Sequence, residues 1–370
     1  MNQIPASSIL PAENLPVWDD DRWQALPSLK GDVSADVCVI GLGGSGLSCV
    51  RELTARGWQV VGLDAGMIAG GAAGRNGGFL LAGTADFYHK AIARMGHAAA
   101  HAWYRTTMAE IQRMYEETPQ HIRLTGSLRI AASPEEEADC RQQMDAMLAD
   151  DIAVEAYQGP EGQGLLIHGD GSFNPLARCR SLALKLQREG AILYEHSPAL
   201  HISAQGVATP AGQVRCHTVV VCVDGGLERI LPELAPRVQT MRLQMLASAV
   251  TSEIHIPRPV YRRWGYDYWQ QLADGRIAVG GFRDHDHEPY GLAHPSIEVQ
   301  QSLEQLLRSH IGVQADITHR WAAHVGYTST GMPIMEEVRP RIWAIGGYSG
   351  TGNVMGAICA RMVVEKIFQS

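Results

Sequence analysis

Apolar residues form their clearest pattern between Asp36 and Asp64. Val37–Ile40 and Val60–Leu63 are unbroken apolar runs, which are typical of strands buried on both faces of a parallel sheet. Between the two runs, apolar residues recur at helical spacing, and Gly57 is placed to end that helix. The pattern predicts a strand–helix–strand unit.

The turn after the first predicted strand has the spacing Gly-x-Gly-x-x-Gly. The residues expected to face a nucleotide there are Gly41, Gly43, Gly44, Ser45 and Gly46. In a dinucleotide-binding fold the first glycine permits a tight turn, the second lets the backbone approach a pyrophosphate, and the third lets the helix pack on the strand. Asp64, followed by Ala65, ends the second strand, where an acid accepts hydrogen bonds from ribose hydroxyls. The stretch therefore predicts a dinucleotide site, with the helix N-terminus facing the phosphates.

Later segments predict two more groups of elements. An α/β pattern returns with a helix at 175–189, strands near 191–194, 206–209 and 219–223, and a strand at 342–345 followed by a glycine turn and a helix to Ile367. Strands of a mainly antiparallel sheet are expected at 241–252, 261–272 and 276–282, with an amphipathic helix at 295–310. Helices are also expected at 88–117 and after Ser133, where Ser-Pro-Glu-Glu is typical of a capped helix start.

These elements predict an α/β fold (α+β overall) with two domains. One is a Rossmann-like nucleotide-binding domain, and the other is a substrate domain on a mainly antiparallel sheet plus helices. The expected boundaries are an N-terminal arm at 1–31 anchored by Trp18 and Trp23, a discontinuous nucleotide domain at 32–85, 160–228 and 320–370, and a substrate domain at 86–159 and 229–319.

Composition narrows the class of protein. The net charge of −8 and the absence of any Lys/Arg-rich run argue against a nucleic-acid partner. The seven cysteines are scattered and never spaced C-x-x-C, which fits a reducing compartment better than a disulfide framework or a zinc site. No secretory signal and no transmembrane run is visible, so a cytoplasmic enzyme is expected.

Three motifs together resemble a known family. They are GLGGSG with Asp64, GAAGRNGG at 71–78, and GGYSGTG at 346–352 before the last helix. With them, the chain resembles the flavin-dependent D-amino-acid oxidase and sarcosine/glycine oxidase superfamily over nearly its whole length. It looks most like the amine-oxidising branch typified by γ-glutamylputrescine oxidase, through its lead-in LPSLKGDVSADVCVIG, DGRIAVGG at 274–281, and Trp321 with Val325 and Gly326.

The resemblance implies an extended FAD, with its pyrophosphate over the first glycine turn and its adenosine ribose on Asp64. It also implies that the isoalloxazine lies between the Arg75–Gly78 loop and the 350–352 turn, and accepts a hydride at N5. The further residues implied to contact the cofactor are Gly71, Ala72, Arg75, Asn76, Gly77, Gly78, Asp224, Gly225, Gly347, Tyr348, Ser349, Gly350, Thr351 and Gly352.

Three departures from the family pattern bear on function. The C-x-Y-T segment that binds flavin covalently in monomeric sarcosine oxidases is Val325-Gly326-Tyr327-Thr328 here, so FAD is expected to be non-covalent. Ala278 replaces the lysine that promotes oxygen reaction, which leaves O2 or an electron carrier open as acceptor. Val325 also replaces the arginine that pairs the α-carboxylate in glycine oxidases, which favours a small primary or secondary amine as substrate.

Candidate substrate residues come from two segments. Alternation along a strand puts Tyr266 and Tyr268 on one face as an aromatic wall for a cationic amine, although ordinary sheet packing explains them as well. His324 is placed to deprotonate an ammonium substrate, or is structural. Residues 284–288 contain possible metal ligands, but a solvated loop is expected and no metal is predicted. Arg262, Arg263 and Arg283 are expected mainly at the surface.

The sequence therefore predicts an FAD-dependent oxidoreductase that oxidises a C–N bond of a small amine by hydride transfer to flavin N5. The resulting imine then hydrolyses. Two alternatives stay open: a D-amino-acid or secondary-amino-acid dehydrogenase or oxidase, and a non-catalytic flavin-binding redox protein. A monomer and a dimer both fit the sequence.

Overall fold

The computed structural model describes residues 14–369, and internal contacts divide the chain into two units. The parallel-sheet unit comprises Trp18–Asn76, Pro175–Met241 and the chain from His324 onward. The antiparallel-sheet unit comprises Gly77–Asn174, Arg242–Ala323 and the described residues up to Val17. Residues 77–85 and 160–174, expected in the nucleotide domain, pack in the antiparallel-sheet unit. Residues 1–13 of the expected arm lie outside the described part of the chain.

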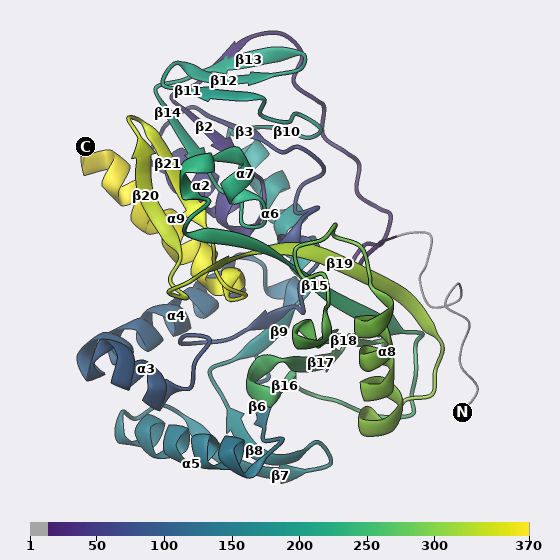
Figure 1. Ribbon diagram of the computed structural model, residues 1–370. Helices are drawn as coiled ribbons and strands as arrows, with labels where there is room; N and C mark the ends of the chain where they lie inside the picture. The colour runs from purple at the N-terminus through teal and green to yellow at the C-terminus, as the bar shows by residue number, and fades with distance from the viewer. Residues whose placement is uncertain (1–13, 370) are drawn as a thin grey trace. The chain divides into compact units, whose positions relative to one another are not determined.

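A six-stranded, mostly parallel sheet forms the first unit (Figure 1), with the order β10-β3-β2-β14-β21-β20. Its strands are β2 (Val37–Ile40), β3 (Val60–Leu63), β10 (Ile192–Tyr194), β14 (Thr218–Val221), β21 (Ile342–Gly346) and the antiparallel edge strand β20 (Ile334–Arg339). Because β2, β3, β14 and β21 are buried along their whole length, their continuous apolar sequences form central strands, as predicted.

Helices cover one face of this sheet. They are α2 (Gly44–Thr54), α6 (Pro175–Arg188) and α9 (Gly352–Gln369), and the short α7 (Leu227–Ile230) follows β14. A Cβ added at Gly356 would lie 3.2 Å from the Ser45 Cβ, so α9 packs closely on the start of α2. The last strand–turn–helix unit thus packs against the first beside the first glycine turn, as the pair of motifs predicts.

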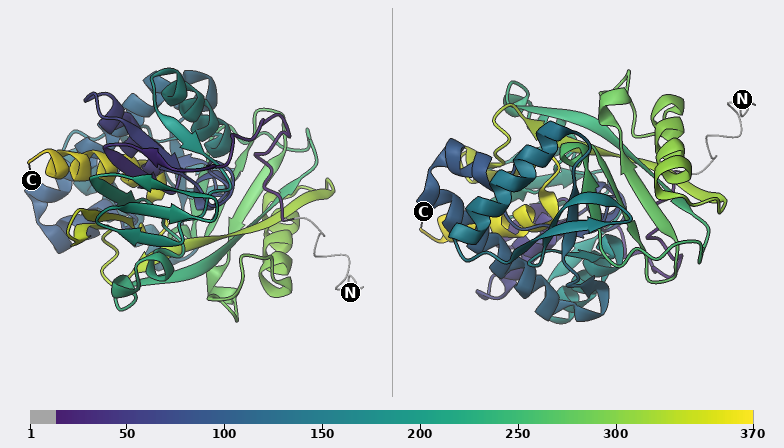
Figure 2. Two further views of the ribbon diagram at one scale, coloured as in Figure 1. Left: turned by 90° about the horizontal axis from the view of Figure 1, so that it is seen from above. Right: turned by 90° about the horizontal axis from the view of Figure 1, so that it is seen from below.

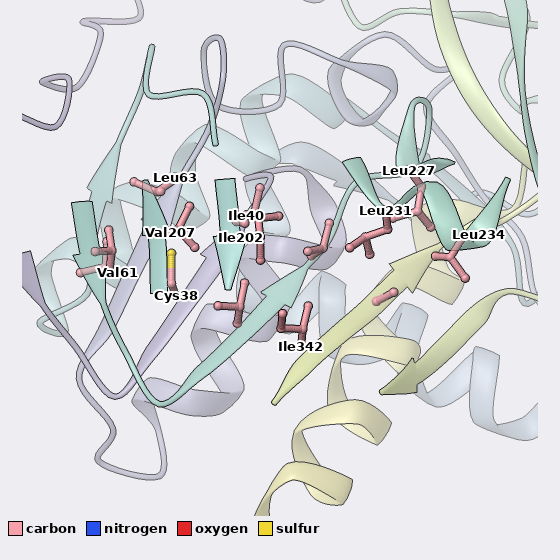
Figure 3. Close-up of a cluster of buried hydrophobic side chains, with 14 of the residues drawn as sticks. Cys38, Ile40, Val61, Leu63, Ile202, Val207, Leu227, Leu231, Leu234 and Ile342 are labelled. Carbon is pink, nitrogen blue, oxygen red and sulfur yellow. The ribbon is translucent and has the colours of Figure 1, made fainter. Parts of the chain in front are cut away.

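A small sheet covers the other face, with the order β1-β13-β12-β11. Its strands are β1 (Val33–Ser34), β11 (His201–Ser203), β12 (Gly206–Thr209) and β13 (Gly212–Arg215). Its side chains Ile202 and Val207 pack against Cys38, Ile40 and Leu63 of the parallel sheet in one buried cluster (Figure 3). This apolar layer fixes the strands whose carboxyl ends carry the glycine turns.

The second unit is built on an eight-stranded sheet with the order β19-β15-β18-β17-β16-β6-β8-β7. Its strands are β6 (Ser127–Ile130), β7 (Val154–Gly159), β8 (Gly162–Ile167), β15 (Val238–Ser248), β16 (Val260–Arg262), β17 (Asp267–Gln271), β18 (Ile277–Gly281) and β19 (Ile317–Thr328). The β16–β6 pair is parallel, whereas β15–β18, β18–β17, β17–β16, β6–β8 and β8–β7 are antiparallel. The predicted α/β class with a second, mainly antiparallel domain is confirmed.

Helices pack on this sheet at two places. Figure 2 shows α8 (Ile297–Gln305, light green), which continues as a π-helix over Leu306–Ile311, beside the long strands, where Val299 and Leu303 bury against Val279 and Trp269. The helices α3 (Tyr88–Met95), α4 (His97–Glu117) and α5 (Pro134–Ala149) share a core with β7 and β8. A separate three-stranded sheet consists of β4 (Phe79–Leu80), β9 (Gly171–Phe173) and β5 (Ile122–Arg123).

Two predicted elements are wrong in their continuity. The helix expected at 88–117 breaks at Gly96, whose φ of +87° lies in the left-handed region and ends α3 before α4 begins. The strand expected at 261–272 is interrupted by a 3₁₀ turn at Arg263–Gly265, where Trp264 also has a positive φ of +53°. No described helix is long and apolar enough to cross a membrane.

Candidate cofactor and substrate site

The first glycine turn joins β2 to α2 through two close approaches. Gly41 has a φ of +90°, and a Cβ there would lie 2.7 Å from the Cys222 carbonyl oxygen. A Cβ at Gly46 would lie 1.8 Å from the Gly41 carbonyl oxygen, a distance at which atoms overlap. The structure therefore requires glycine at both positions, and the helix begins directly over the end of the strand.

The N-terminus of α2 presents backbone N–H groups without a side-chain cap. Gly43 precedes the helix, no side chain caps it, and its first turn contains no acid. A Cβ on Gly44 would meet no protein atom within 4 Å, so the space beside this turn is open. Free N–H groups and the positive end of the helix dipole make this helix N-terminus suited to bind an anionic group such as a phosphate.

The carboxylate of Asp64, at the end of β3, accepts hydrogen bonds from two nearby backbone amides. Its Oδ2 accepts from the Leu42 amide at 2.8 Å, and its Oδ1 accepts from the Gly66 amide at 2.9 Å. Burial raises the pKa of Asp64, while these two hydrogen bonds oppose the rise. A carboxylate has about four lone-pair sites, so about two remain for ribose hydroxyls. Ala65, next along the chain, is exposed.

The loop after β3 is tied to the C-terminal helix by Asn76. Its Nδ2 donates to the carbonyls of Ala72 and Ala73 at 3.1 and 2.8 Å, and its Oδ1 accepts from Asn353 Nδ2 at 3.0 Å. Trp18 Nε1 donates to the Asn76 carbonyl at 2.9 Å, which anchors the arm as predicted. The segments expected to hold opposite sides of one cofactor are thus joined by a direct hydrogen bond.

Two further residues of this loop, Arg75 and Gly71, are expected to contact the cofactor. Arg75 Nε donates to the Gly70 carbonyl at 2.9 Å, and burial lowers the pKa of Arg75. A Cβ at Gly71 would meet no atom within 4 Å, and Ala72 begins a 3₁₀ turn over Ala72–Gly74. The backbone around Gly71 therefore borders open space, like that around Gly44.

Asp224 organises the C-terminal glycine turn. Its Oδ1 accepts from the Tyr348 amide at 3.0 Å and its Oδ2 from the Gly326 amide at 3.1 Å. Burial raises the pKa of Asp224 to about 6. From the sequence, Asp224 is expected only to contact the cofactor. Its role in holding the turn has no sequence signal, because the amides that it binds lie more than 100 residues away in the chain.

The turn itself runs from Gly347 to Thr351 and has three positive φ angles, at Gly347, Ser349 and Gly350. The Ser349 amide donates to the Gly326 carbonyl at 2.9 Å, and Thr351 Oγ1 donates to the Tyr348 carbonyl at 2.7 Å. Gly352 then starts α9. These bonds hold a second helix N-terminus beside a tight turn, which is the arrangement the motif predicts.

Glu195 is a site residue that sequence reasoning missed. It is fully buried, and its carboxylate accepts from Trp23 Nε1 at 3.0 Å and from the amides of Leu26 and Ile68, each at 2.5 Å. It therefore ties the arm to the segment that follows Asp64. An acidic residue directly after a short strand has no sequence feature that predicts such a role. Only its hydrogen bonds to residues far away in the chain show that Glu195 anchors the arm.

Tyr268 lies in an aromatic cluster of the antiparallel-sheet unit. Its ring is 5.7 Å from Phe79 and 5.8 Å from Tyr261, centroid to centroid. A Cβ at Gly77 would lie 3.0 Å from the Tyr268 ring, and Gln270 Nε2 donates to the Gly77 and Gly78 carbonyls at 2.5 and 3.1 Å. The cluster is thus packed against the Gly77–Gly78 segment of the expected cofactor loop.

The alternation expected for Tyr266 and Tyr268 is wrong. Tyr266 lies before β17 in helical backbone conformation, because the 3₁₀ turn at Arg263–Gly265 interrupts the strand. Its ring lies 4.6 Å from the Arg283 guanidinium and 5.8 Å from that of Arg263. Arg263 forms ion pairs with Asp267 at 2.7 Å and with Asp284 at 2.9 Å, so it is structural and not merely solvated.

His324 lies on β19 and is half-buried. A Cβ at Gly225 would lie 2.4 Å from the His324 carbonyl oxygen, so its backbone packs directly on the Asp224–Gly225 turn. Val325 and Gly326 follow it and are buried. The structure thus brings His324 and Gly225 together, and the role of the imidazole stays a prediction.

The acidic and histidine-rich segment 284–288 has structural partners. Asp286 accepts a two-point hydrogen bond from Arg242, at 2.8 and 2.5 Å, and this pair is buried. No group of three or more His, Cys, Asp or Glu side chains suited to a metal occurs among residues 14–369. Three features of the parallel-sheet unit fit FAD as the cofactor. The glycine turn before α2 borders open space, Asp64 has lone pairs left for ribose hydroxyls, and α9 offers a second helix N-terminus.

Comparisons with known proteins agree with this geometry. The model of a family described as FAD dependent oxidoreductase (DAO) matches residues 36–366. A probable oxidoreductase OrdL of Rhizobium meliloti (strain 1021) is 26% identical over 374 residues, covering 92% of this chain and 84% of its own. The γ-glutamylputrescine oxidoreductase of Escherichia coli (strain K12) is 26% identical over 380 residues, which cover 93% of this chain and 86% of that protein.

Solved structures of similar fold include two that act on amino acids by their names. The glycine oxidase of Geobacillus kaustophilus has a TM-score of 0.76 at 17% identity, covering 91% of this chain and 95% of its own. The L-proline dehydrogenase of P. horikoshii has a TM-score of 0.75 at 19% identity, and the match covers 93% of this chain and 94% of that one. At these identities the likeness concerns the fold.

Proposed function

Because this chain belongs to the FAD dependent oxidoreductase (DAO) family, we propose that it oxidises a C–N bond of a small primary or secondary amine. It is an FAD-dependent amine oxidoreductase, and the proposal concerns the substrate and the reaction. The product is an imine that water hydrolyses to a carbonyl compound and the released amine or ammonia. The observation that supports an amine most directly is the Phe79–Tyr261–Tyr268 cluster beside Gly77.

FAD, when bound, supplies the group that accepts a hydride from the substrate carbon. The residues of this chain then bind and orient it. The N-terminus of α2 would hold the pyrophosphate and Asp64 would accept from the ribose, while the hydrogen bond between Asn76 and Asn353 joins the two segments that would hold the cofactor. Asp224 fixes the 347–351 turn, whose N–H groups and helix stabilise negative charge placed there.

Aromatic rings favour a cationic substrate because their faces carry partial negative charge. The stabilisation is about 1–2 kcal/mol when the contact excludes water, which corresponds to about tenfold in affinity. We propose that Tyr268 supplies such a face and that His324 acts as the base that deprotonates the ammonium group. Only the neutral amine can lose a hydride.

Replacing Tyr268 by alanine is therefore expected to raise KM for the amine about tenfold, with a smaller change in kcat. Steady-state kinetics measures this, and Tyr290→Phe is a matched control because Tyr290 is an exposed tyrosine of the same unit. Equal KM values for Tyr268→Ala and wild type would remove Tyr268 from the substrate site.

Non-covalent FAD is expected because Val325 stands where a covalent linkage would need cysteine. Acid precipitation of the protein is predicted to leave all of the flavin in the supernatant, measured by its absorbance. Flavin that sediments with the protein would show a covalent bond at another residue.

Oxidation of an α-amino acid is the second candidate, and it needs an arginine for the carboxylate. Arg242 and Arg263 are paired with acids, whereas Arg123 on β5 donates to neutral groups, the Gln271 carbonyl at 2.7 Å and Gln270 Oε1 at 3.4 Å. Burial lowers the pKa of Arg123. A substrate carboxylate near Gln270 would find this guanidinium.

Product analysis separates the two candidates. Primary amines, N-methyl amines, glutamylated polyamines and D-amino acids are incubated with the enzyme, and carbonyl products are trapped as hydrazones. Oxygen uptake and dye reduction are followed in parallel, because O2 and an electron carrier both fit as acceptor. Carbonyl products from amines without an α-carboxylate support the proposal. Products from α-amino acids alone would replace it by the second candidate, with Arg123→Gln expected to abolish them.

A further inference from the structure

Two cysteines of the parallel-sheet unit lie close together and take no part in the proposed reaction. Cys38 lies on β2 and is fully buried, whereas Cys216, in the short connection from β13 to β14, is half-buried. Cys216 packs against the buried apolar cluster that contains Cys38 (Figure 3). Its two neighbours, Arg215 and His217, are exposed, so solvent reaches this connection.

Backbone hydrogen bonds fix Cys216 beside the start of β2. The amides of His217 and Thr218 both donate to the Asp36 carbonyl, at 3.0 and 3.2 Å. Thr218 then begins the parallel pairing of β14 with β2. Cys216 directly precedes these two bonds, and Cys38 follows Asp36 by two residues. The same pair of segments therefore holds both cysteines.

The two thiols are in contact. The Cys38 thiol donates a hydrogen bond to the Cys216 sulfur, and the backbone amides of Cys38 and Thr218 donate to the same sulfur. These bonds lower the pKa of Cys216, although partial burial opposes the shift, and the charge of Arg341 lowers it further. Burial raises the pKa of Cys38 well above its usual range. Cys216 is therefore the more readily ionised of the two.

Access to solvent distinguishes Cys216 from the other cysteines. The thiolate is the form of cysteine that reacts with peroxides, and it must be reachable from solvent. Among the seven cysteines, all of which lie within residues 14–369, only Cys216 is not buried. The remaining five, besides Cys38 and Cys216, are Cys49, Cys140, Cys179, Cys222 and Cys359.

A second pair of thiols provides an internal comparison. Cys49 on α2 and Cys222 after β14 are also joined by a thiol–thiol hydrogen bond, but both are buried. Proximity is thus common to the two pairs, and only the Cys38–Cys216 pair combines it with access from solvent.

We propose that Cys216 and Cys38 are a peroxide-responsive thiol pair, which hydrogen peroxide converts to a disulfide. The Cys216 thiolate attacks one peroxide oxygen, the O–O bond breaks, and Cys216 becomes a sulfenic acid. The hydroxide that leaves takes up the proton that Cys216 released. The Cys38 sulfur then attacks the Cys216 sulfur, the S–O bond breaks, and water leaves with the Cys38 proton. Overall, two thiols are oxidised to one disulfide, and one peroxide is reduced to two waters.

The disulfide would join the start of β2 to the connection that enters β14. The glycine turn at Gly41 and the carboxylate of Asp224 follow the opposite ends of these two strands. FAD is therefore expected to stay bound when the disulfide forms. Closure of the disulfide also stops the oxidation of Cys216 before the irreversible sulfinic and sulfonic acids.

Peptide mapping of the FAD-loaded protein tests the proposal without any amine substrate. The reduced protein is treated with a small molar excess of hydrogen peroxide at neutral pH, and free thiols are alkylated during denaturation. Mass spectrometry without reductant is expected to show the loss of two of the seven thiols and one linked peptide pair, Cys38 with Cys216. Dithiothreitol is expected to reverse both changes, while Cys49 and Cys222 stay alkylated throughout.

Variants separate the two steps. Cys216→Ser is expected to lose no thiol at the same peroxide concentration, because the attacking sulfur is absent. Cys38→Ala is expected to accumulate a sulfenic acid at Cys216, which dimedone labels. Cys179→Ala is the matched control, because Cys179 is a buried cysteine of α6, and it is expected to lose two thiols as wild type does.

Three results would overturn the proposal. They are Cys216 that stays alkylated after peroxide treatment, a disulfide between other cysteines, and loss of two thiols that persists in Cys216→Ser. The wild-type peptide map needs no substitution in the core, so it decides the question even if Cys38→Ala fails to fold. Because peroxide is added directly, the outcome does not depend on the proposed amine oxidation.

Discussion

Gly46→Ala is expected to yield a protein without FAD. The added Cβ would lie 1.8 Å from the Gly41 carbonyl oxygen and 3.4 Å from the Cys222 Cβ, so α2 must move away from the end of β2. Overpacking a core typically costs about 1–3 kcal/mol, and a Cβ that overlaps a backbone carbonyl oxygen is expected to cost at least the top of that range. The flavin content of the purified protein and its thermal midpoint both measure the loss.

Gly44→Ala is the informative partner of this variant. A Cβ at Gly44 meets no protein atom within 4 Å, and alanine favours a helix over glycine by about 1 kcal/mol. The apoprotein is expected to be as stable as wild type, while FAD binds at least tenfold more weakly because the methyl group occupies the space beside the helix N-terminus. Wild-type FAD affinity in Gly44→Ala would show that the pyrophosphate lies elsewhere.

Asp224→Asn is expected to loosen the C-terminal turn. The asparagine side chain has one acceptor oxygen, so either the Gly326 or the Tyr348 amide loses its partner. Leaving a buried N–H unpaired costs about 1–3 kcal/mol. FAD affinity is expected to fall with stability, because this turn precedes the N-terminus of α9. Urea unfolding and FAD titration of the variant measure both effects.

The pH dependence of this variant follows from the raised pKa of Asp224. The folded pKa is about 6, against a usual value of 3.8, so the folded state binds the proton more tightly and wild-type stability falls as pH rises through this window. The fall from this residue is at most about 3 kcal/mol. The amide of the Asp224→Asn variant cannot titrate, so the variant apoprotein loses less stability than wild type between about pH 4 and 7. Parallel pH curves for the two apoproteins would contradict this assignment.

The sequence predicts the cofactor half of the molecule well, because its signals are local. Gly41 and Gly46 stand five residues apart, and the steric demands that they meet arise inside one turn. The apolar runs of β2 and β3 form central strands because a parallel sheet buries both faces of each strand. Spacing alone is therefore enough to predict this unit.

The sequence predicts the substrate half less well, because its geometry depends on distant contacts. Tyr266 fails the alternation rule because a turn with left-handed residues interrupts the strand, and no glycine or proline pair marks that turn as strongly as a hairpin would. Asp224 and Glu195 look like ordinary loop acids until their partners, far along the chain, are seen. Hydrogen bonds between residues this far apart in the chain leave no recognisable spacing in the sequence.

The most direct test is anaerobic mixing of the purified yellow protein with a small amine that lacks an α-carboxylate. The account predicts that the flavin absorbance bleaches within the reaction time and returns when O2 or an electron carrier is admitted. Bleaching by dithionite but by no amine or amino acid would contradict the proposed oxidation of a C–N bond.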